Sequence, residues 1–423
     1  MIDIKRIRDN PETVKAALLK RMDAVDFTEV LAWDRQRKEI NHRLDALRQR
    51  RNAASKRMPL LKANDEYATE LRAEMKLVGE ETKRLESEES ALGQSLRVFL
   101  DALPNIPDAD VVEGGKENNE VVRSWGEKPQ FWFNALDHVD LVTKLRLVDY
   151  KRGAKLGGNG FWMYTGNGAL LEWALINYFV REHLNDGYEL ILPPHILTNA
   201  CGYTAGQFPK FADDVFTLDK AQHFLLPTAE TALVNIYRDE ILQEDDLPRK
   251  LFSYTPCYRR EGGSYRTNER GMIRGHQFNK VELFQYTRPE DSDAALEEMI
   301  GKAQRLVSAL GLHYRVSKLA ARDCSASMAK TLDIEVWIPS MGEYKEVSSA
   351  SNARDFQARR GNMRFRRKGS NGIEHMHTLN ASGLATSRLV PAMVEQLQRE
   401  DGSVVVPEVL RGMVGKDVLR PID

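Results

Sequence analysis

The sequence predicts an α+β protein, in which an N-terminal antiparallel helical hairpin (a coiled coil) precedes a body built on an antiparallel β-sheet flanked by helices. Residues 1–103 contain two of the chain's 28 glycines and repeat apolar side chains in heptads. Beyond residue 130, short strand-like runs alternate with amphipathic helices. Tight turns rather than helices separate many of these runs, which favours antiparallel pairing over parallel βαβ units.

The hairpin is predicted from two heptad registers. One occupies residues 30–58 and the other residues 71–103, with alternating steps of three and four. Pro59 and Asn64 interrupt the pattern between them, where the chain would reverse its direction. Each arm of roughly 30 residues would be about 45 Å long.

The two arms carry opposite charge. Residues 35–62 contain ten Lys or Arg against two acidic residues, whereas residues 66–90 contain eight Glu against four basic residues. Ion pairs across the hairpin and a solvated surface are the usual meaning of such runs. The surplus of eight positive charges on the first arm is equally typical of a nucleic-acid-binding surface, so charge alone leaves both interpretations open.

The remainder of the chain divides into a linker and a larger domain. Residues 104–130 are rich in Pro, Gly and Asn, lack hydrophobic periodicity, and are predicted to be the linker. Residues 131–423 are predicted to form the α+β domain. Its expected helices are 170–185 and 292–310, and its expected strands are 188–193, 223–226, 250–258, 281–286, 333–339 and 344–347.

Composition indicates the compartment. Cys201, Cys257 and Cys324 lie far apart without a CxxC spacing, so neither a disulfide framework nor a thiolate zinc site is expected. The sequence shows neither a signal-peptide core nor an apolar run long enough for a membrane span. We therefore expect a cytoplasmic protein that does not enter a membrane.

The segment 255–284 carries the strongest chemical signal. A Gly- and Arg-rich loop lies between two apolar strands, and the segment holds Arg259, Glu261, Arg266, Arg270, Arg274 and Phe278. Guanidinium forks bind phosphate oxygens at two points, and an aromatic face stacks on a base. Glu282 follows amid apolar neighbours, as a carboxylate in a ligand pocket would. The sequence therefore predicts a nucleotide triphosphate site, although a lone Arg-rich loop also fits a surface with ion pairs. The chain lacks the GxxxxGK[ST] and GxGxxG motifs, so a βαβ nucleotide site is not expected.

Three further groups of residues could complete that site. Glu346, Ser348 and Ser349 offer the oxygen ligands that Mg²⁺ prefers. Arg388 falls in the first turn of a helix expected to begin near Ala385, after a run of small residues that lets a ligand approach the backbone. Thr228 and Glu230 end a strand-like run, where they fit either a ligand or a helix cap. Glu335 fits a surface hairpin as readily as a metal site.

Together these segments resemble the class II seryl-tRNA synthetases. The resemblance rests on CYRRE, IRGHQFNKVEL, the TAE at 228–230, EVSS at 346–349, DFQARR at 355–360 and LNASGLATSR, and it covers essentially the whole chain. It implies a class II antiparallel catalytic sheet, a homodimer, and a helical hairpin that binds tRNA(Ser). It also implies that ATP activates L-serine to seryl-adenylate, and that the seryl group passes to the 3′ end of tRNA(Ser).

The resemblance also implies a role for individual residues. Arg259 and Arg388 would be catalytic, Arg259 at the α-phosphate and Arg388 at the outer phosphates. The expected ATP-binding residues are Arg259, Arg260, Glu261, Arg274, Phe278, Glu346, Val347, Ser348, Ser349 and Arg388, with Mg²⁺ held by Glu346 and Ser349. The expected serine-binding residues are Thr228, Ala229, Glu230, Arg259, Glu282, Asn380 and Ser382. The expected tRNA-binding residues are Arg35, Arg37, Lys38, Arg43, Arg48, Arg50 and Arg51.

Some positions depart from the family pattern. Ala381 and Ser387 replace glycines of the usual NGSGLAVGR run, and a side chain at Ser387 would come close to the nucleotide. The residues assigned to ATP and serine are nevertheless present. These departures fit a divergent copy, so two alternatives accompany the leading interpretation. One is a specialised paralogue that supplies seryl-tRNA to a side pathway or gives resistance to an inhibitor, and the other is an inactive tRNA-binding regulator.

Overall fold

The computed structural model describes residues 1–61, 66–261, 271–370 and 372–421. Their contacts separate two compact units, Met1–Pro104 and Asn105–Asp423. Within the described residues, no helix is both long and apolar enough to cross a membrane.

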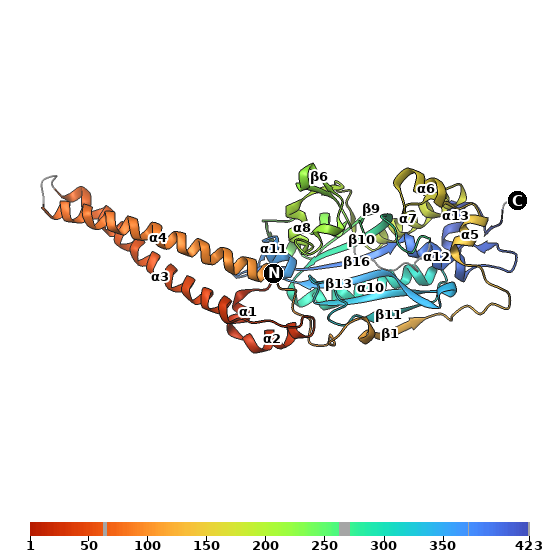
Figure 1. Ribbon diagram of the computed structural model, residues 1–423, viewed down its shortest axis with the longest axis horizontal. Helices are drawn as coiled ribbons and strands as arrows, with labels where there is room; N and C mark the ends of the chain where they lie inside the picture. Colours follow the sequence, from red (N-terminus) through yellow and green to blue (C-terminus); the bar gives the residue numbers. More distant parts are fainter. Residues whose placement is uncertain (62–65, 262–270, 371, 422–423) are drawn as a thin grey trace. The chain divides into compact units, whose positions relative to one another are not determined.

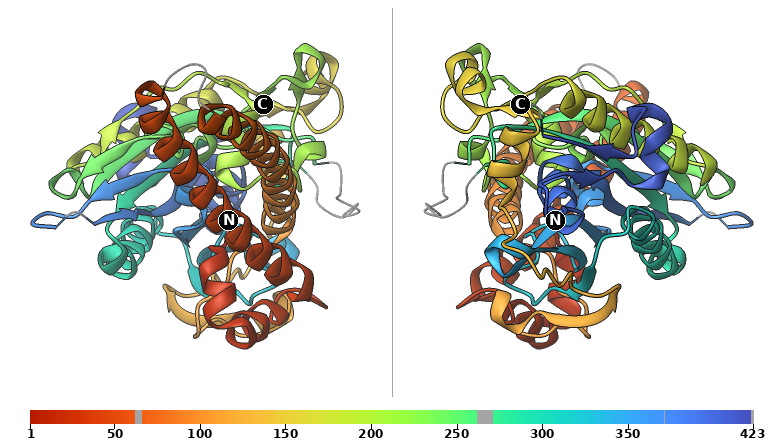
Figure 2. Two further views of the ribbon diagram at one scale, coloured as in Figure 1. Left: turned by 90° about the vertical axis from the view of Figure 1, so that its left-hand side faces the viewer. Right: turned by 90° about the vertical axis from the view of Figure 1, so that its right-hand side faces the viewer.

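The first unit is helical. Its helices are α1 (Ile4–Asp9), α2 (Pro11–Leu19), α3 (Thr28–Arg57) and α4 (Glu66–Ala102). The long helices α3 and α4 run side by side as an antiparallel pair (Figures 1 and 2). Ile40 and Leu44 of α3 are buried against Leu85 of α4, as the heptad registers predict. The predicted helical hairpin is therefore confirmed.

The second unit is organised around an eight-stranded sheet (Figure 1). Its strands, in spatial order, are β1 (Glu120–Trp125), β11 (Tyr314–Lys318), β12 (Lys330–Ile338), β13 (Glu343–Arg354), β16 (His377–Ala385), β10 (Gln277–Thr287), β9 (Arg249–Tyr258) and β4 (Glu189–Leu190). All neighbours pair antiparallel except β4, which runs parallel to β9. The predicted antiparallel sheet is confirmed, with one parallel edge strand added.

Three amphipathic helices, α7 (Asn167–Asn185), α10 (Ser292–Ala309) and α12 (Thr386–Gln396), pack against this sheet. Their apolar side chains join those of the central strands in one large core, for example Phe179 of α7, Met299 of α10 and Leu389 of α12. The expected helices 170–185 and 292–310 correspond to α7 and α10. The helix expected near Ala385 is α12, for which Ala385 is the N-cap.

Smaller elements surround the sheet. The remaining strands form small sheets, β5 (Ile196–Thr198) with β6 (Thr217–Leu218) and β7 (His223–Leu225), β8 (Ile241–Gln243) with β14 (Arg364–Arg366) and β15 (Ile373–His375), β2 (Val148–Asp149) with β3 (Met163–Tyr164), and β17 (Val404–Val405) with β18 (Val418–Leu419). The short helices are α5 (His138–Lys144), α6 (Tyr150–Gly157), α8 (Asn199–Ala205), α9 (Glu230–Leu233), α11 (Phe356–Arg360) and α13 (Glu408–Val414).

The segment 104–130 differs from the predicted linker. Its strand β1 pairs with β11 at one edge of the large sheet, with Trp125 opposite Tyr314. The Asn105 side chain also donates hydrogen bonds to the backbone oxygens of Ser327 and Ala353, at 2.9 and 2.8 Å. The sequence showed no strand pattern here because all six residues of β1 are exposed. An edge strand with both faces solvated lacks the apolar alternation that reveals half-buried strands.

Candidate active site

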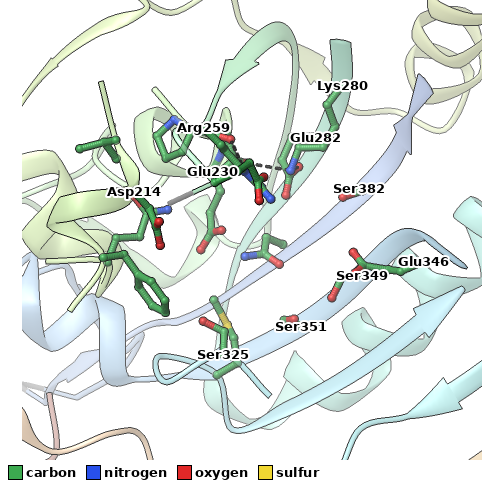
Figure 3. Close-up of a pocket in the computed structure, with 18 of the residues that line it drawn as sticks. Asp214, Glu230, Arg259, Lys280, Glu282, Ser325, Glu346, Ser349, Ser351 and Ser382 are labelled. Carbon is green, nitrogen blue, oxygen red and sulfur yellow. Dashed lines mark hydrogen bonds and ion pairs between the residues drawn. The ribbon is translucent and has the colours of Figure 1, made fainter. Parts of the chain in front are cut away.

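The predicted site residues converge on one cavity of about 540 Å³ over the large sheet (Figure 3). Strands β10, β13 and β16 contribute to its wall, together with the chain around residues 207–230 and the end of β9. Ten predicted residues line it: Thr228, Glu230, Arg259, Glu261, Arg274, Glu282, Glu346, Ser349, Asn380 and Ser382. Residues from five separate stretches of sequence thus face a common space.

The alternation of side chains along β10 explains which of its residues line this cavity. Successive side chains of a strand point to opposite faces, so Lys280 and Glu282 share one face. Val281 and Leu283 point the other way and are fully buried in the core. Glu282 lies opposite Ser382 of β16, which brings these two residues together at the cavity wall.

The wall of the cavity contains a buried ion pair. Glu282 is 2% exposed and pairs with the ammonium group of Lys280, which is 6% exposed. Lys280 Nζ also donates a hydrogen bond of 2.8 Å to Thr228 Oγ1. The sequence interpretation did not include Lys280. Its two-residue spacing from Glu282 was the available signal, because that spacing places both side chains on one face of a strand.

Glu230 lies beside this pair, at the start of α9. Burial raises the pKa of its carboxyl to about 7, and the negative charge of Glu282 acts in the same direction. Gln357 Nε2 opposes the shift by donating a 2.8 Å hydrogen bond to Glu230 Oε1. Thr378 Oγ1 donates to Gln357 Oε1 at 2.7 Å and so orients the amide. Gln357 is a second residue that the sequence interpretation missed, because it lies 127 residues from its partner.

Two arginines also line the cavity. Arg259 Nε donates to the Pro227 carbonyl at 3.2 Å, and the Arg259 guanidinium carbon lies 5.2 Å from the centre of the Phe278 ring. Arg274 forms an ion pair with Glu261. Cationic guanidinium groups and an aromatic face therefore meet here, as phosphate and base binding require.

Arg388 extends this cluster. Its Nε donates to the Ile273 carbonyl at 3.1 Å, and its Nη1 donates to the Glu346 carbonyl at 3.0 Å. The Arg388 Nη1 also lies 3.4 Å from a carboxylate oxygen of Glu346. The first turn of α12 is thereby tied both to the strand that carries Glu346 and to the chain just before β10.

Several predicted residues do not line the cavity. Ala229 and Val347 are buried in the hydrophobic cores, and Ser348 Oγ donates to the Ser382 carbonyl at 2.6 Å. Arg260 is exposed, and its backbone N–H donates to the Asp214 carbonyl at 2.8 Å. Phe278, Arg388 and Ser387 are likewise not part of the cavity lining. Ser387 is 7% exposed. Arg266 and Arg270 lie outside the described residues.

The basic side chains predicted to bind tRNA lie along α3 in the first unit. Arg37 is partly buried and its Nη2 lies 2.5 Å from a carboxylate oxygen of Glu89 on α4, so it belongs to the seam between the helices. Arg50 pairs with Glu74 of α4. The others are exposed: Arg35, Lys38, Arg43, Arg48, Arg50 and Arg51. Of these, Arg35, Arg43 and Arg51 form no ion pair with any residue that the structure describes.

Metal ligands are sparse in the described part of the chain. No group of three or more His, Cys, Asp or Glu side chains there is arranged to hold a metal ion by itself. Any cation at Glu346 and Ser349 would need oxygen atoms from a ligand to complete its coordination.

Comparison with known proteins identifies the family of the chain. Residues 1–107 match the seryl-tRNA synthetase N-terminal domain, and residues 216–397 match the class II tRNA synthetase core domain of the G, H, P, S and T enzymes. Serine–tRNA ligase 2 of Clostridium acetobutylicum is 62% identical over 99% of this chain and 100% of that protein. The crystal structure of Pyrococcus horikoshii seryl-tRNA synthetase complexed with ATP has a TM-score of 0.94 at 32% identity, covering all of both chains. Cytoplasmic serine–tRNA ligase of Naegleria fowleri, in complex with AMP, has a TM-score of 0.88 at 25% identity, covering 100% of this chain and 99% of that one.

Proposed function

The chain belongs to the seryl-tRNA synthetases, and from this we propose that it activates L-serine with ATP and transfers the seryl group to tRNA(Ser). The proposal depends mainly on one observation. A single cavity is lined both by arginines that can bind phosphate and by carboxylates that can bind the serine ammonium group. The Lys280–Glu282 pair, Thr228, Arg259 and Arg274 all line this one cavity. The full-length similarity to proteins named serine–tRNA ligase supports the same activity.

Activation would join the two substrates directly. A carboxylate oxygen of serine attacks the α-phosphorus of ATP, and the bond between the α-phosphorus and the bridging oxygen breaks to release pyrophosphate. Such a reaction needs alignment and charge stabilisation rather than a protein nucleophile. Arg259 would neutralise the α-phosphate and orient the serine carboxylate. Arg388 and Arg274 would hold the outer phosphates, and Phe278 would stack on adenine.

The carboxylates of the cavity suit serine. Glu282 and Glu230 supply carboxylates for an ammonium and a hydroxyl group, and Thr228, Asn380 and Ser382 supply polar atoms beside them. A site built to hydrogen-bond a substrate hydroxyl rejects the analogue that lacks it by about 10⁴–10⁵, because its own polar groups are then left unpaired. We therefore expect strong discrimination against alanine.

Mg²⁺ would bind with ATP at Glu346 and Ser349. Both residues line the cavity, and a carboxylate with a hydroxyl oxygen is a donor set that hard cations accept. When bound, the ion would neutralise part of the phosphate charge. The contribution of this chain is to hold the two oxygen ligands on one strand, β13, which is paired on both sides within the sheet.

The tRNA would bind along α3. Exposed Arg35, Arg43 and Arg51, which form no ion pair with a described residue, leave positive charge available for a phosphate backbone. Helical RNA is read mostly by shape and backbone contacts, which a long rigid hairpin can supply. Arg37 is the weakest member of the predicted set because Glu89 already neutralises it.

A homodimer would cover exposed apolar side chains of the second unit. Leu170 and Trp173 of α7 are 46% and 54% exposed, and Leu192 and Ile196 are 75% and 54% exposed. Burying such side chains against a second copy of the chain would remove their apolar surface from water. Light scattering at several protein concentrations would report the mass of the assembly.

The proposed function is tested by charging total tRNA with labelled serine, ATP and Mg²⁺. Transfer of label to tRNA(Ser) is the expected result. Folded protein that binds tRNA(Ser) but neither exchanges pyrophosphate nor transfers serine would instead support the regulator alternative. The specialised paralogue would pass the same assay, because it would use the same residues.

A further inference from the structure

A second cavity, of about 290 Å³, adjoins the first. The two cavities share Phe211, Ser325, Glu346, Ser349 and Ser351. The wall of the second cavity also contains the carboxylates Asp323, Asp333 and Glu335, to which no role has yet been assigned. The proposed Mg²⁺ ligands therefore share a cavity wall with three further carboxylates.

Asp333 lies closest in register to one of those ligands. It belongs to β12 and pairs with Ser349 across the antiparallel ladder to β13. Asp333 is 8% exposed, and its Oδ1 has no hydrogen-bond partner among the described residues. Directly opposite side chains of an antiparallel strand pair lie on the same face of the sheet, so the Asp333 carboxyl and the Ser349 hydroxyl are neighbours in the wall of this cavity. A buried carboxylate with an oxygen left over is costly unless a cation or a donor compensates it.

The other carboxylates of this wall are already compensated. Glu335 Oε2 accepts hydrogen bonds from Ser317 Oγ at 2.6 Å and from Arg315 Nε at 2.8 Å. Asp323 Oδ2 accepts one from Asn119 Nδ2 at 2.8 Å. Asp333 thus differs from its neighbours in having a buried carboxylate oxygen without a partner in the described chain.

The electrostatic setting of Asp333 agrees with this picture. Burial raises the pKa of the Asp333 carboxyl well above its ordinary value, and the negative charge of Glu346 raises it further. The neighbouring Ser349 hydroxyl acts in the opposite direction.

We propose that Asp333 is a positioning residue for the Mg²⁺ site. It accepts the hydrogen bond of the Ser349 hydroxyl, which turns an oxygen lone pair of Ser349 toward the ion. Groups that orient metal ligands in this way contribute typically 10–100-fold to metal affinity. The inference rests on the proposed binding of Mg²⁺–ATP at Glu346 and Ser349.

The test uses Mn²⁺ as the probe, followed by electron paramagnetic resonance in the presence of a saturating non-hydrolysable ATP analogue. Chelation by the analogue is the same for every protein, so differences in apparent Mn²⁺ affinity arise from the chain. We expect Asp333→Asn to weaken Mn²⁺ binding about 10–100-fold. The matched control is Glu335→Gln, which removes the same charge from the same strand and cavity but from a carboxylate that is already compensated. This control should bind Mn²⁺ as the unmodified protein does.

A double-mutant cycle distinguishes the positioning of Ser349 by Asp333 from a general loss of structure. If Asp333 acts through Ser349, then Asp333→Asn combined with Ser349→Ala should bind Mn²⁺ little worse than Ser349→Ala alone. Mn²⁺ affinity unchanged in Asp333→Asn, or lowered equally by Glu335→Gln, would overturn the proposal. Additive losses in the cycle would overturn it as well. Failure of the proposed function has a different signature, because unmodified protein would then fail to charge tRNA or to bind the ATP analogue.

Discussion

The raised pKa of Glu230 predicts that the use of serine depends on pH near neutrality. The pKa of its carboxyl is about 7, through burial and the adjacent Glu282, so it binds a proton as the pH falls through this value. With that pKa, roughly nine tenths of Glu230 is ionised at pH 8 and roughly one tenth at pH 6. If the ionised form is needed to bind the serine ammonium group, then kcat/KM for serine at pH 6 should be about a tenth of its value at pH 8.

ATP–pyrophosphate exchange at varied serine concentration, between pH 5.5 and 8.5, would measure this dependence. The KM for ATP serves as an internal control, since Glu230 is proposed to contact serine and not ATP. His183 and His377 do not interfere, because burial lowers the pKa of each to about 4 and both stay neutral in this range.

The variant Glu230→Gln keeps the shape of the side chain and removes its titration. Its kcat/KM for serine should be low and flat across the range, close to the value of the unmodified protein at pH 6. A profile that is flat between pH 6 and 8 in the unmodified protein would refute this reasoning. So would a pH dependence that persists in the Gln variant, since another group would then be responsible.

Three further changes test the rest of the site and the hairpin. Lys280→Met leaves Glu282 as an uncompensated buried charge, and should lower the free energy of unfolding by about 3–5 kcal/mol; urea unfolding would show this, and Lys280→Met combined with Glu282→Gln should recover most of the loss. Arg388→Ala should slow pyrophosphate exchange by roughly 10²–10³, as removal of one transition-state charge contact does elsewhere; unchanged exchange would show that Arg388 holds no phosphate. Arg43→Glu with Arg51→Glu should weaken tRNA charging and reduce its salt dependence while leaving pyrophosphate exchange intact; equal loss of both activities would contradict a role confined to tRNA.

The helical hairpin and the types of residue at the site were predictable from sequence because both depend on local spacing. Apolar side chains repeated in heptads over 30–58 and 71–103 require two helices that bury one stripe each, and Ile40, Leu44 and Leu85 are buried as expected. Arg259, Arg274 and Glu282 were identifiable because charged groups between or within apolar strands need a polar partner. Strand β1 escaped prediction, since an edge strand with solvated faces has no periodic signal.

Sequence by itself therefore determined the fold class, the family and the kinds of side chain available for phosphate and serine. Tertiary structure decided which of these side chains compensate one another. Lys280 is paired with Glu282 and bound to Thr228, which lies 52 residues away, whereas Gln357 rather than a cation contacts Glu230. The register between β12 and β13 likewise placed Asp333 opposite Ser349. Such pairings, and the pKa of Glu230 that follows from them, depend on burial and on distances between strands remote in the chain, which no local pattern of residues specifies.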